Sequence, residues 1–346
     1  MMSKTEENNE KGDGRTGLDN LGNTCFLNSA MQCISHTYEL NKFLDKETYK
    51  KRLNKVADSI VLYEWDKLRK MMWSENCIIS PGGFFTSIRK VANLKDRVIF
   101  TGYAQNDLTE FLNFLIDCFH EGIKREVDME MTGTAKTDKD KLAIACYKMY
   151  MRMYSKEYSE ILDLFYGIHV SKLSFNSGHH QSSSPEPFFN LSLPIPNKRR
   201  VSLMDCFDEY TKQELLDGDN KVINDVTKEK EDCLKQLLFF SLPQILIIIL
   251  KRFDNSGKRK NTVVDIPLAN LNLDKYMVGY KEPNVSYDLY GVCNHMGTAM
   301  GGHYTAYVKI QNGKWYLFND RNVSEYSGNV ISEKSYCLFY RKKKLN

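Results

Sequence analysis

The stretch GLDNLGNTCFLNSAMQ, residues 17–32, places Cys25 where a turn rich in glycine and asparagine becomes a helix. Asn23 or Thr24 is expected to cap the first turn. Unpaired N–H groups and the positive end of the helix dipole stabilise a thiolate at such a position. From these local features alone, a nucleophilic Cys25 and a buried, inert one carry equal weight. From Thr24 onward, apolar residues recur at helical spacing: Leu27, Ala30, Met31 and Ile34.

The composition excludes several classes of protein. A net charge of +4, from 48 basic and 44 acidic residues, is too balanced to indicate nucleic-acid binding. The most apolar run, residues 242–250, is far shorter than the roughly 20 residues that span a bilayer, so it predicts a buried strand and no membrane insertion. None of the 9 cysteines is in CxxC spacing and no signal peptide is recognisable, which favours a reducing cytoplasmic or nuclear compartment.

The order of the predicted elements indicates an α+β fold. Residues 1–16 carry almost no apolar side chains and are expected to form a disordered tail. Helical patterns dominate to about residue 164. Alternating strand patterns follow, with a hairpin signal at Asn312-Gly313.

A nucleophilic cysteine needs a base, and His303 is the strongest candidate among the 7 histidines. It follows two glycines and begins a predicted strand, so its ring can project beside the loop of residues 296–301, which is expected to be mobile. His36 and His120 lie near the polar faces of predicted helices and are expected at the surface.

The hairpin at Asn312-Gly313 predicts what lies beside this histidine. Symmetric pairing sets residues 303–306 against residues 319–322, which brings Asn319 and Asp320 close to the histidine. A polar group beside a histidine fixes its tautomer and orientation. The order cysteine, histidine, then asparagine or aspartate is that of papain-like hydrolases, although the order alone recurs by chance.

Taken together, stretches along most of the chain resemble the blocks of the ubiquitin-specific protease family. Residues 17–32 resemble its cysteine box. Residues 103–117, YAQNDLTEFLNFLID, resemble its Gln-Gln-Asp box, with Asn106 in place of the second glutamine. SEILDLFYG, EPFFNLSLPI and LPQILIIILKRF resemble its later blocks, and residues 287–323 with SYCLFY resemble its histidine box. The blocks occur in the family's order from about Gly17 to Arg341.

The resemblance implies a papain-like cysteine protease fold, of α+β class, over residues 17–342. A helical thumb is expected over about residues 17–164. An antiparallel palm and β-stranded fingers are expected over about residues 165–342, with the fingers over about residues 168–240.

The resemblance also implies roles for single residues. Cys25 is the expected nucleophile, His303 its base and Asn319 the third member of the triad. Asn20 is expected to donate to the oxyanion, and Asp320 is the alternative residue for orienting the histidine. Three residues of the Gln-Gln-Asp box are expected to line the ubiquitin-binding cleft: Gln105, Asp107 and Glu110.

The implied activity is deubiquitination, the thiol-dependent hydrolysis of the isopeptide or peptide bond at the C-terminal glycine of ubiquitin. The expected partners are ubiquitin and ubiquitinated proteins, with neither nucleic acid nor membrane, and the expected state is a monomer. Two alternatives stay open. One is a catalytically weak ubiquitin-binding pseudoenzyme, and the other is a protease for another ubiquitin-like modifier.

The sequence departs from the family at the fingertips, where many members bind zinc through two CxxC pairs. An ungapped alignment puts Phe175 and Gly178 at the first pair, and Asn224 and Thr227 at the second. None of these residues is a zinc ligand. We therefore expect no structural zinc and no cofactor, and expect strand pairing and packing to hold the fingers.

Overall fold

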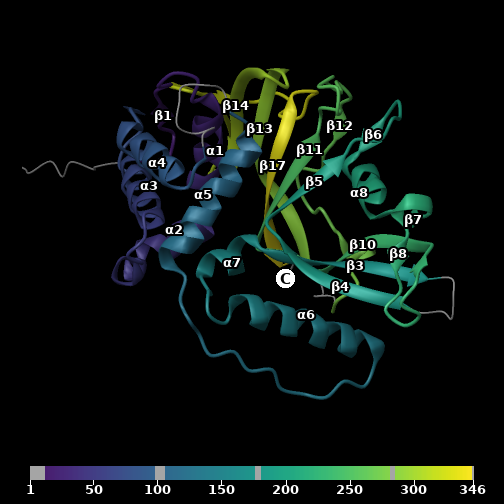
Figure 1. Cartoon of the computed structure of the whole chain (residues 1–346). Coiled ribbons are helices and arrows are strands. Elements are labelled where there is room, and N and C mark those ends of the chain that lie inside the picture. Colours follow the sequence, from purple (N-terminus) through teal and green to yellow (C-terminus); the bar gives the residue numbers. More distant parts are fainter. Residues whose placement is uncertain (1–11, 98–105, 176–180, 281–284, 345–346) are drawn as a thin grey trace, which may run out of the picture. The chain divides into compact units, whose positions relative to one another are not determined.

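The computed structural model describes residues 12–97, 106–175, 181–280 and 285–344 (Figure 1). The chain forms two compact units. Unit 1 comprises Met1–Gly122 and Gly291–Val330, and unit 2 comprises Ile123–Tyr290 and Ile331–Asn346. These two units do not correspond to the predicted thumb, palm and fingers. The boundaries of those subdomains stay a prediction.

Unit 1 combines helices with one end of an antiparallel sheet. Its helices are α1 (Cys25–Ser35), α2 (Tyr38–Asp45), the 3-10 helix η1 (Thr48–Arg52), α3 (Asp58–Met72), α4 (Gly82–Leu94) and α5 (Leu108–Ile123). Its strands are β1 (Gly17–Leu18), β2 (Ile78–Ile79), the end of β13 (Val285–Thr298), β14 (Gly301–Lys309), β15 (Trp315–Asn319) and β16 (Asn322–Tyr326). β13 to β16 pair antiparallel in sequence order, whereas β1 and β2 pair in parallel.

Helix α1 lies in the core of unit 1, and all 11 of its residues are buried. It packs against β14 and β15, which lie almost 300 residues further along the chain (Figure 1). Two of its buried amide side chains place their nitrogen next to main-chain carbonyls, because an unpaired amide N–H in the core is destabilising. Gln32 Nε2 donates to Thr16 O at 2.8 Å, and Asn28 Nδ2 lies 3.3 Å from Leu18 O.

Three further helices of unit 1 are held together by a cluster of large apolar side chains. Trp65 of α3 is fully buried and packs against Phe84 of α4, with ring centroids 5.9 Å apart. Its other neighbour is Phe119 of α5, at 6.5 Å in a stacked arrangement. Aromatic rings dominate the burial in such a core, so this cluster fixes α3, α4 and α5 together.

Unit 2 contains helices, a four-stranded sheet, part of a seven-stranded sheet, and two small two-stranded sheets. Its helices are α6 (Asp138–Tyr154), α7 (Glu160–Phe165), α8 (Leu203–Thr211) and the 3-10 helices η4 (Gly218–Asn220) and η5 (Asp274–Tyr276). Its strands are β3 (Gly167–Phe175), β4 (Gln181–Phe188), β5 (Asn190–Pro194), β6 (Val201–Ser202), β7 (Glu214–Leu216), β8 (Val222–Ile223), β9 (Lys230–Glu231), β10 (Cys233–Ser241), β11 (Ile245–Lys251), β12 (Val264–Asp265), the start of β13 and β17 (Ser335–Lys344).

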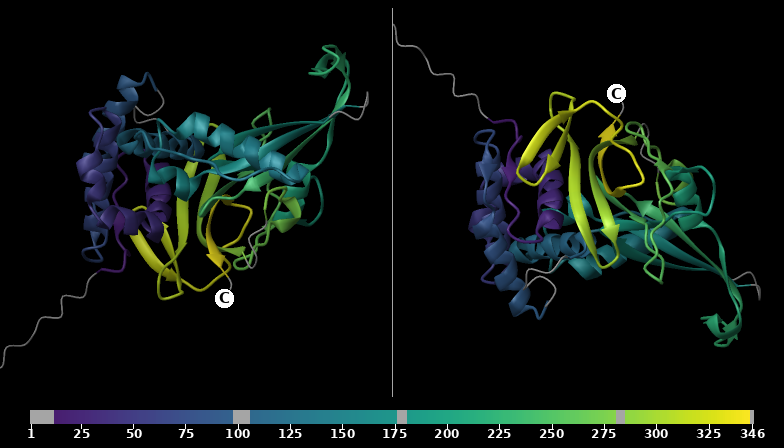
Figure 2. Two further views of the ribbon diagram at one scale, coloured as in Figure 1. Left: turned by 90° about the horizontal axis from the view of Figure 1, so that it is seen from below. Right: turned by 90° about the horizontal axis from the view of Figure 1, so that it is seen from above.

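The long strands of unit 2 form a sheet in the order β4-β3-β10-β7. Figure 2 shows these strands reaching a distal tip, where the small β8–β9 hairpin lies. Helix α6 begins with a capping box made by Thr137 and Asp140, and it packs its buried Cys146 against Val170 and Phe240. One face of the sheet is thereby covered by α6.

The predicted buried strand is confirmed as β11, which is buried from Ile245 to Leu250. It pairs in parallel with β5 and antiparallel with β17. A strand with neighbours on both sides and both faces covered tolerates a continuous apolar run. Among the described residues, no helix combines the length and the hydropathy needed to cross a membrane.

Residues 82–94, to which we assigned no separate helix, form α4, which starts directly after Pro81. One expectation about the helical region is wrong. His36 and His120 were expected at the surface, but both are buried. The ring of His36 packs against Trp73, and its Nδ1 lies 2.9 Å from Gln32 O, so an aromatic environment and a carbonyl replace water.

Candidate active site

Cys25 is the first residue of α1, and 3 % of its surface is exposed. Gly22 and Asn23 before it have φ of 98° and 55°, so two left-handed residues turn the chain into the helix. The N-cap Thr24 makes no capping hydrogen bond through its side chain, contrary to one of the two predicted caps. Its Oγ1 instead accepts from Leu21 N at 2.9 Å.

The pKa of the Cys25 thiol lies above its ordinary value in this structure. Burial raises the pKa of the Cys25 thiol and outweighs the backbone N–H groups that favour the thiolate. The negative charge of Asp320 raises this pKa further. The N–H groups at the helix start thus favour the thiolate as predicted, but burial is the larger effect, and the sequence shows the helix start without the depth at which it is buried.

His303 lies on β14 and is held by Asn319 of β15. His303 Nε2 donates to Asn319 Oδ1 at 2.7 Å, in the tautomer that leaves Nδ1 unprotonated. Cys25 Sγ lies 4.0 Å from the carbonyl oxygen of Gly302, the residue immediately before this histidine. The structure thus brings Cys25, His303 and Asn319 together within unit 1.

The strand register between β14 and β15 differs from the predicted one by one residue. Ala306 pairs with Phe318, whereas symmetric pairing about the turn set Ala306 against Asn319. The histidine and the asparagine still meet, because both lie near the ends of their strands, where a long side chain reaches beyond its direct partner.

Asp320 contacts two asparagines in this structure. Its Oδ2 accepts from Asn20 Nδ2 at 3.0 Å, and its Oδ1 accepts from Asn28 Nδ2 at 2.8 Å. The backbone is left-handed here, with φ of 50°, and Asp320 O accepts from Leu18 N at 3.0 Å. The carboxylate therefore connects the turn before Cys25 to α1.

Asn28 is a functional candidate that the sequence reasoning missed. It lies one helical turn after Cys25, and 2 % of its surface is exposed. Polar side chains are rarely so buried without a specific partner. A polar residue three positions after a candidate nucleophile, on a helix with an apolar stripe, is the sequence signal that could have identified it.

The side chain of Asn20 is fixed by hydrogen bonds at both ends of its amide. Its Oδ1 accepts from Gly22 N and Thr24 N, both at 3.1 Å, and its Nδ2 donates to Asp320. An amide nitrogen carries two N–H groups, so one stays available while Asp320 holds the other. This orientation suits a donor to a developing negative charge beside Cys25.

The segment before His303 is a β-hairpin and not the irregular loop that was expected. Gly297 pairs with Gly302 and Thr298 with Gly301, which leaves two residues at the turn. A Cβ on Gly302 would lie 2.2 Å from Met296 O, so this position requires glycine. Met300 at the turn is 93 % exposed.

The residues of the predicted ubiquitin cleft are only partly described. Gln105 lies outside the described residues. Asp107 Oδ1 accepts from Thr109 N at 2.8 Å and from Glu110 N at 3.2 Å, which caps α5. Glu110 lies in the first turn of the same helix, and its side chain is exposed.

The distal tip of unit 2 is closed by hydrogen bonds around Asn224, which is fully buried. Asn224 Oδ1 accepts from Val226 N at 2.9 Å, and its Nδ2 donates to Glu231 Oε1 at 3.1 Å. Thr227 Oγ1 donates to the same carboxylate. Phe175 is buried, whereas Gly178 lies outside the described residues. Among the residues that the structure describes, no group of His, Cys, Asp and Glu side chains is arranged to hold a metal.

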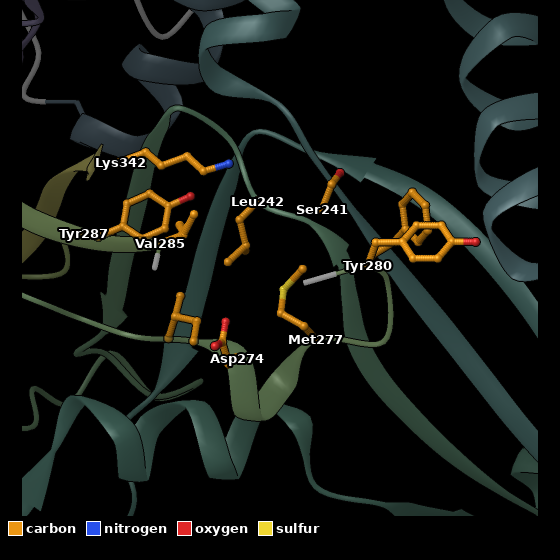
Figure 3. Close-up of a pocket in the computed structure, with 10 residues that line it drawn as sticks. Ser241, Leu242, Asp274, Met277, Tyr280, Val285, Tyr287 and Lys342 are labelled. Atoms are coloured by element: carbon orange, nitrogen blue, oxygen red, sulfur yellow. The ribbon is translucent and has the colours of Figure 1, made fainter. Parts of the chain in front are cut away.

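Unit 2 also contains a pocket with Lys342 at one edge, Asp274 at another, and the apolar Leu242 and Met277 between them (Figure 3). Its two tyrosine hydroxyls are engaged elsewhere. Tyr287 donates to Pro243 O at 2.6 Å, and Tyr280 donates to Asp140. None of the predicted site residues lines this pocket, so it carries no part of the predicted chemistry.

The sequence and the structure of this chain are similar to those of known proteins. Residues 16–340 match the profile of a family described as "Ubiquitin carboxyl-terminal hydrolase". The chain is 36% identical over 344 residues to "Ubiquitin carboxyl-terminal hydrolase 2" of Bos taurus and of Homo sapiens, which covers 96% of this chain and 56% of each relative. The Gallus gallus protein of that name is 37% identical over 350 residues, covering 98% of this chain and 96% of its own length. The chain thus spans about half the length of the bovine and human relatives.

Solved structures give the same picture. The "SAGA DUB module Ubp8(C146A)/Sgf11/Sus1/Sgf73 bound to monoubiquitin" aligns with a TM-score of 0.73 and 26% identity, covering 96% of this chain and 70% of that one. The "SAGA Ubp8/Sgf11/Sus1/Sgf73 DUB module bound to ubiquitin aldehyde" aligns with a TM-score of 0.73, covering 97% of this chain and 71% of that one.

Proposed function

The chain belongs to the ubiquitin carboxyl-terminal hydrolase family, and from this premise we propose that it is a cysteine-type deubiquitinase. The predicted α+β, papain-like cysteine protease fold is confirmed by the likeness to the solved structures. The proposed reaction is hydrolysis of the isopeptide or peptide bond at the C-terminal glycine of ubiquitin. One observation carries the proposal. His303 is held by Asn319 at 2.7 Å, and Cys25 Sγ lies 4.0 Å from the carbonyl oxygen of Gly302, the residue directly before His303.

The reaction begins from a neutral thiol, because burial raises the pKa of Cys25. His303 Nε2 is engaged by Asn319, so Nδ1 is the nitrogen that takes the thiol proton. The sulfur then attacks the glycine carbonyl carbon of ubiquitin, a C–S bond forms, and negative charge develops on the oxygen. The second N–H of Asn20 donates to that oxygen.

The intermediate collapses when the C–N bond breaks. His303 gives its proton to the leaving lysine amine, which departs and leaves a thioester on Cys25. His303 then deprotonates a water that attacks the thioester, so free ubiquitin and the thiol are restored. Asn319 is neutral, so it orients the ring without adding charge to the thiolate–imidazolium pair.

The substrate contacts belong to the same proposal. The residues proposed to line the path of the ubiquitin tail are Gln105, Asp107 and Glu110. The carboxylates among them suit the basic tail of ubiquitin. The exposed Met300 at the hairpin turn before His303 offers an apolar contact near the reacting bond. The proposed partners are ubiquitin and ubiquitinated proteins.

Several finer statements remain part of the proposal. We propose a monomer that acts in a reducing cytoplasmic or nuclear compartment, since none of the 9 cysteines forms a disulfide among the described residues. We also propose that no metal is required, because hydrogen bonds around Asn224 close the position at which relatives with CxxC pairs bind zinc.

A fluorogenic amide of the ubiquitin C-terminus tests the proposal. The chain should release the fluorophore, and Cys25→Ala should abolish turnover while ubiquitin binding is retained. Cys77→Ala is the matched control, because Cys77 is the one described cysteine that is partly exposed. Turnover retained in Cys25→Ala would refute the assignment. Ubiquitin binding without turnover by the unaltered chain would identify a pseudoenzyme, and faster cleavage of another modifier's amide would change the substrate.

A further inference from the structure

Two basic loops of unit 2 begin at the same end of a pair of parallel strands. β5 and β11 run in parallel, with Pro194 opposite Lys251 at their final residues. The chain leaves β5 through residues 195–200 and β11 through residues 252–263. We call the exposed cations of this region the basic patch: Lys198, Arg199, Arg200, Lys251, Lys258 and Lys260.

Contacts within unit 2 hold the two loops together. Lys260 Nζ donates to Ile195 O at 2.9 Å, which links one loop to the other. The loops then lead into β6 and β12, which pair in parallel with Val201 opposite Val264. The cations of the basic patch therefore gather at one place, although some 60 residues separate the loops in sequence.

A buried arginine lies beneath the second loop. Arg252 is fully buried, and its Nη1 donates to Lys260 O at 3.1 Å and to Thr262 O at 2.8 Å. Main-chain carbonyls satisfy a guanidinium group without cancelling its charge. Burial, and then the positive charge of Arg259, lower the pKa of Arg252 to about 10, so it stays protonated at neutral pH. It adds to the positive field of the patch.

The charge of the chain is concentrated at this place. Residues 195–202 and 251–265 contain eight cations and two carboxylates, a net charge of +6, whereas the whole chain carries +4. The remainder of the chain is therefore net negative, at −2. Asp254 is occupied within its own loop, because its Oδ1 accepts from Ser256 N and Lys258 N. Asp205 offsets one cation through its ion pair with Lys198 at 2.6 Å.

We infer that the basic patch is a docking surface for an acidic segment of a partner protein, rich in aspartate and glutamate. Guanidinium and ammonium groups from two loops can pair with successive carboxylates of an extended chain. A short acidic segment can stay on the patch and avoid the net negative remainder of the molecule. The inference goes beyond hydrolysis of ubiquitin, because it concerns how a second protein is held.

Other polyanions fit the patch less well. Stacking of nucleic-acid bases needs exposed aromatic rings, and the only aromatic residue in these two loops, Phe253, is partly covered by Arg259 at 5.3 Å. Membrane attachment needs apolar side chains to insert. Among the described residues of the two loops, 195–200 and 252–263, Val263 is the only exposed apolar side chain, and one valine gives little to insert.

Binding of a fluorescent peptide of alternating glutamate and serine tests the inference, with fluorescence anisotropy on the full chain. We expect binding at least about tenfold tighter than that of the glutamine–serine analogue, weakening as salt rises from about 50 to about 300 mM. The triple variant Arg199→Glu/Arg200→Glu/Lys258→Glu should lose at least about tenfold in affinity. Its matched control is Lys148→Glu/Arg152→Glu/Lys156→Glu, which reverses three exposed cations in and after α6 of the same unit.

Several outcomes would overturn the inference. Equal loss in the control variant would mean that net charge, and not the patch, attracts the peptide. Tighter binding to a DNA duplex or to phosphatidylserine vesicles would assign the patch to another class of ligand. A higher KM for the ubiquitin amide in the patch variant would mean that ubiquitin itself uses the patch. Turnover of that amide by the unaltered chain tests the proposed hydrolase separately, so the two proposals fail independently.

Discussion

At the scale of single residues, Asp320 organises the turn that precedes the nucleophile. Its carboxylate accepts from Asn20 at 3.0 Å and from Asn28 at 2.8 Å, while His303 is held by Asn319. The two candidate orienters therefore have separate contacts in this structure. Asn319 contacts the proposed base, and Asp320 contacts the proposed donor to the oxyanion.

Substituting Asp320 should reduce kcat through Asn20. Loss of an oxyanion donor costs on the order of 3 kcal/mol of barrier, so we expect Asn20→Ala and Asp320→Ala each to lower kcat by tenfold or more, with a small change in KM. If both act through one hydrogen bond, the double variant should be no slower than Asn20→Ala alone. Rates for the ubiquitin amide in the four proteins of this cycle give the answer.

Asn319→Ala is the contrasting variant of that cycle. The free-energy costs of Asn319→Ala and Asn20→Ala should add in the double variant. Asn319→Ala removes the hydrogen bond to His303 Nε2 and not the one to the oxyanion donor. It should also move the pH profile of kcat/KM, since the tautomer of the base is no longer fixed. If the losses in kcat of Asn20→Ala and Asp320→Ala multiply in the double variant, Asp320 acts on the histidine instead.

The titration of Cys25 gives a second test at this scale. Burial raises the pKa of Cys25, and Asp320 raises it further, so the thiolate should form only at a pH above that of a free thiol. Alkylation by iodoacetamide requires the thiolate, so its rate should rise with pH through a midpoint above that of glutathione. Asp320→Asn should lower the midpoint, as followed by mass spectrometry of the Cys25 peptide. A midpoint below that of glutathione would contradict this assignment.

Among the helices and strands, the sequence predicted those that depend on a local pattern of apolar residues. The helix after Thr24 and the buried strand within residues 242–250 both follow from apolar spacing. We did not predict helix α4 as a separate element, because its glycine pair and preceding proline are turn signals that the packing of Phe84 against Trp65 overrides.

The closeness of Asn319 to His303 was predicted from the sequence, but the burial of Cys25 and the contacts of Asp320 were not. The positions of Cys25, His303 and Asn319 follow from motif and hairpin. The burial of α1 depends on strands almost 300 residues away, so no local signal shows that the thiol is desolvated. The spacing of Asn28 from Cys25 could have drawn attention to it, but its partner Asp320 lies 292 residues further along, so the contact itself was not predictable from local sequence.

The fingertip hairpin offers a prediction about a single element. Asn224→Ala removes two hydrogen bonds in a fully buried position. It should destabilise the protein by about 1–3 kcal/mol, which corresponds to a fall in Tm of a few degrees. Asn220→Ala, at an exposed position of η4, is the control and should change little. Thermal melts monitored by circular dichroism measure both.

Chelation tests the accompanying proposal that the tip needs no metal. Treatment of the purified chain with EDTA or phenanthroline should change neither its Tm nor its turnover of the ubiquitin amide, since hydrogen bonds hold the tip. A fall in Tm that zinc restores would show that the tip carries a structural metal after all.

At the scale of the whole molecule, chain connectivity links the two units. The chain passes from one unit to the other after Gly122, after Tyr290 and after Val330. Strand β13 (Val285–Thr298) begins in the range of unit 2 and ends in that of unit 1, where it pairs with β14 and His303. Unfolding of unit 2 would therefore release one end of a strand that supports the active site, which predicts a single cooperative transition.

Binding of ubiquitin to the inactive chain tests this coupling. Ubiquitin at about 100 times its Kd should stabilise Cys25→Ala by about 2.7 kcal/mol. For a chain larger than a single small domain, we expect a rise in Tm of roughly 2–4 °C or less. If the units unfold together, the entire transition moves as one in differential scanning calorimetry. Two resolved transitions, of which ubiquitin shifts only one, would show that β13 does not transmit stability between the units. No shift at saturation would instead count against ubiquitin as the ligand.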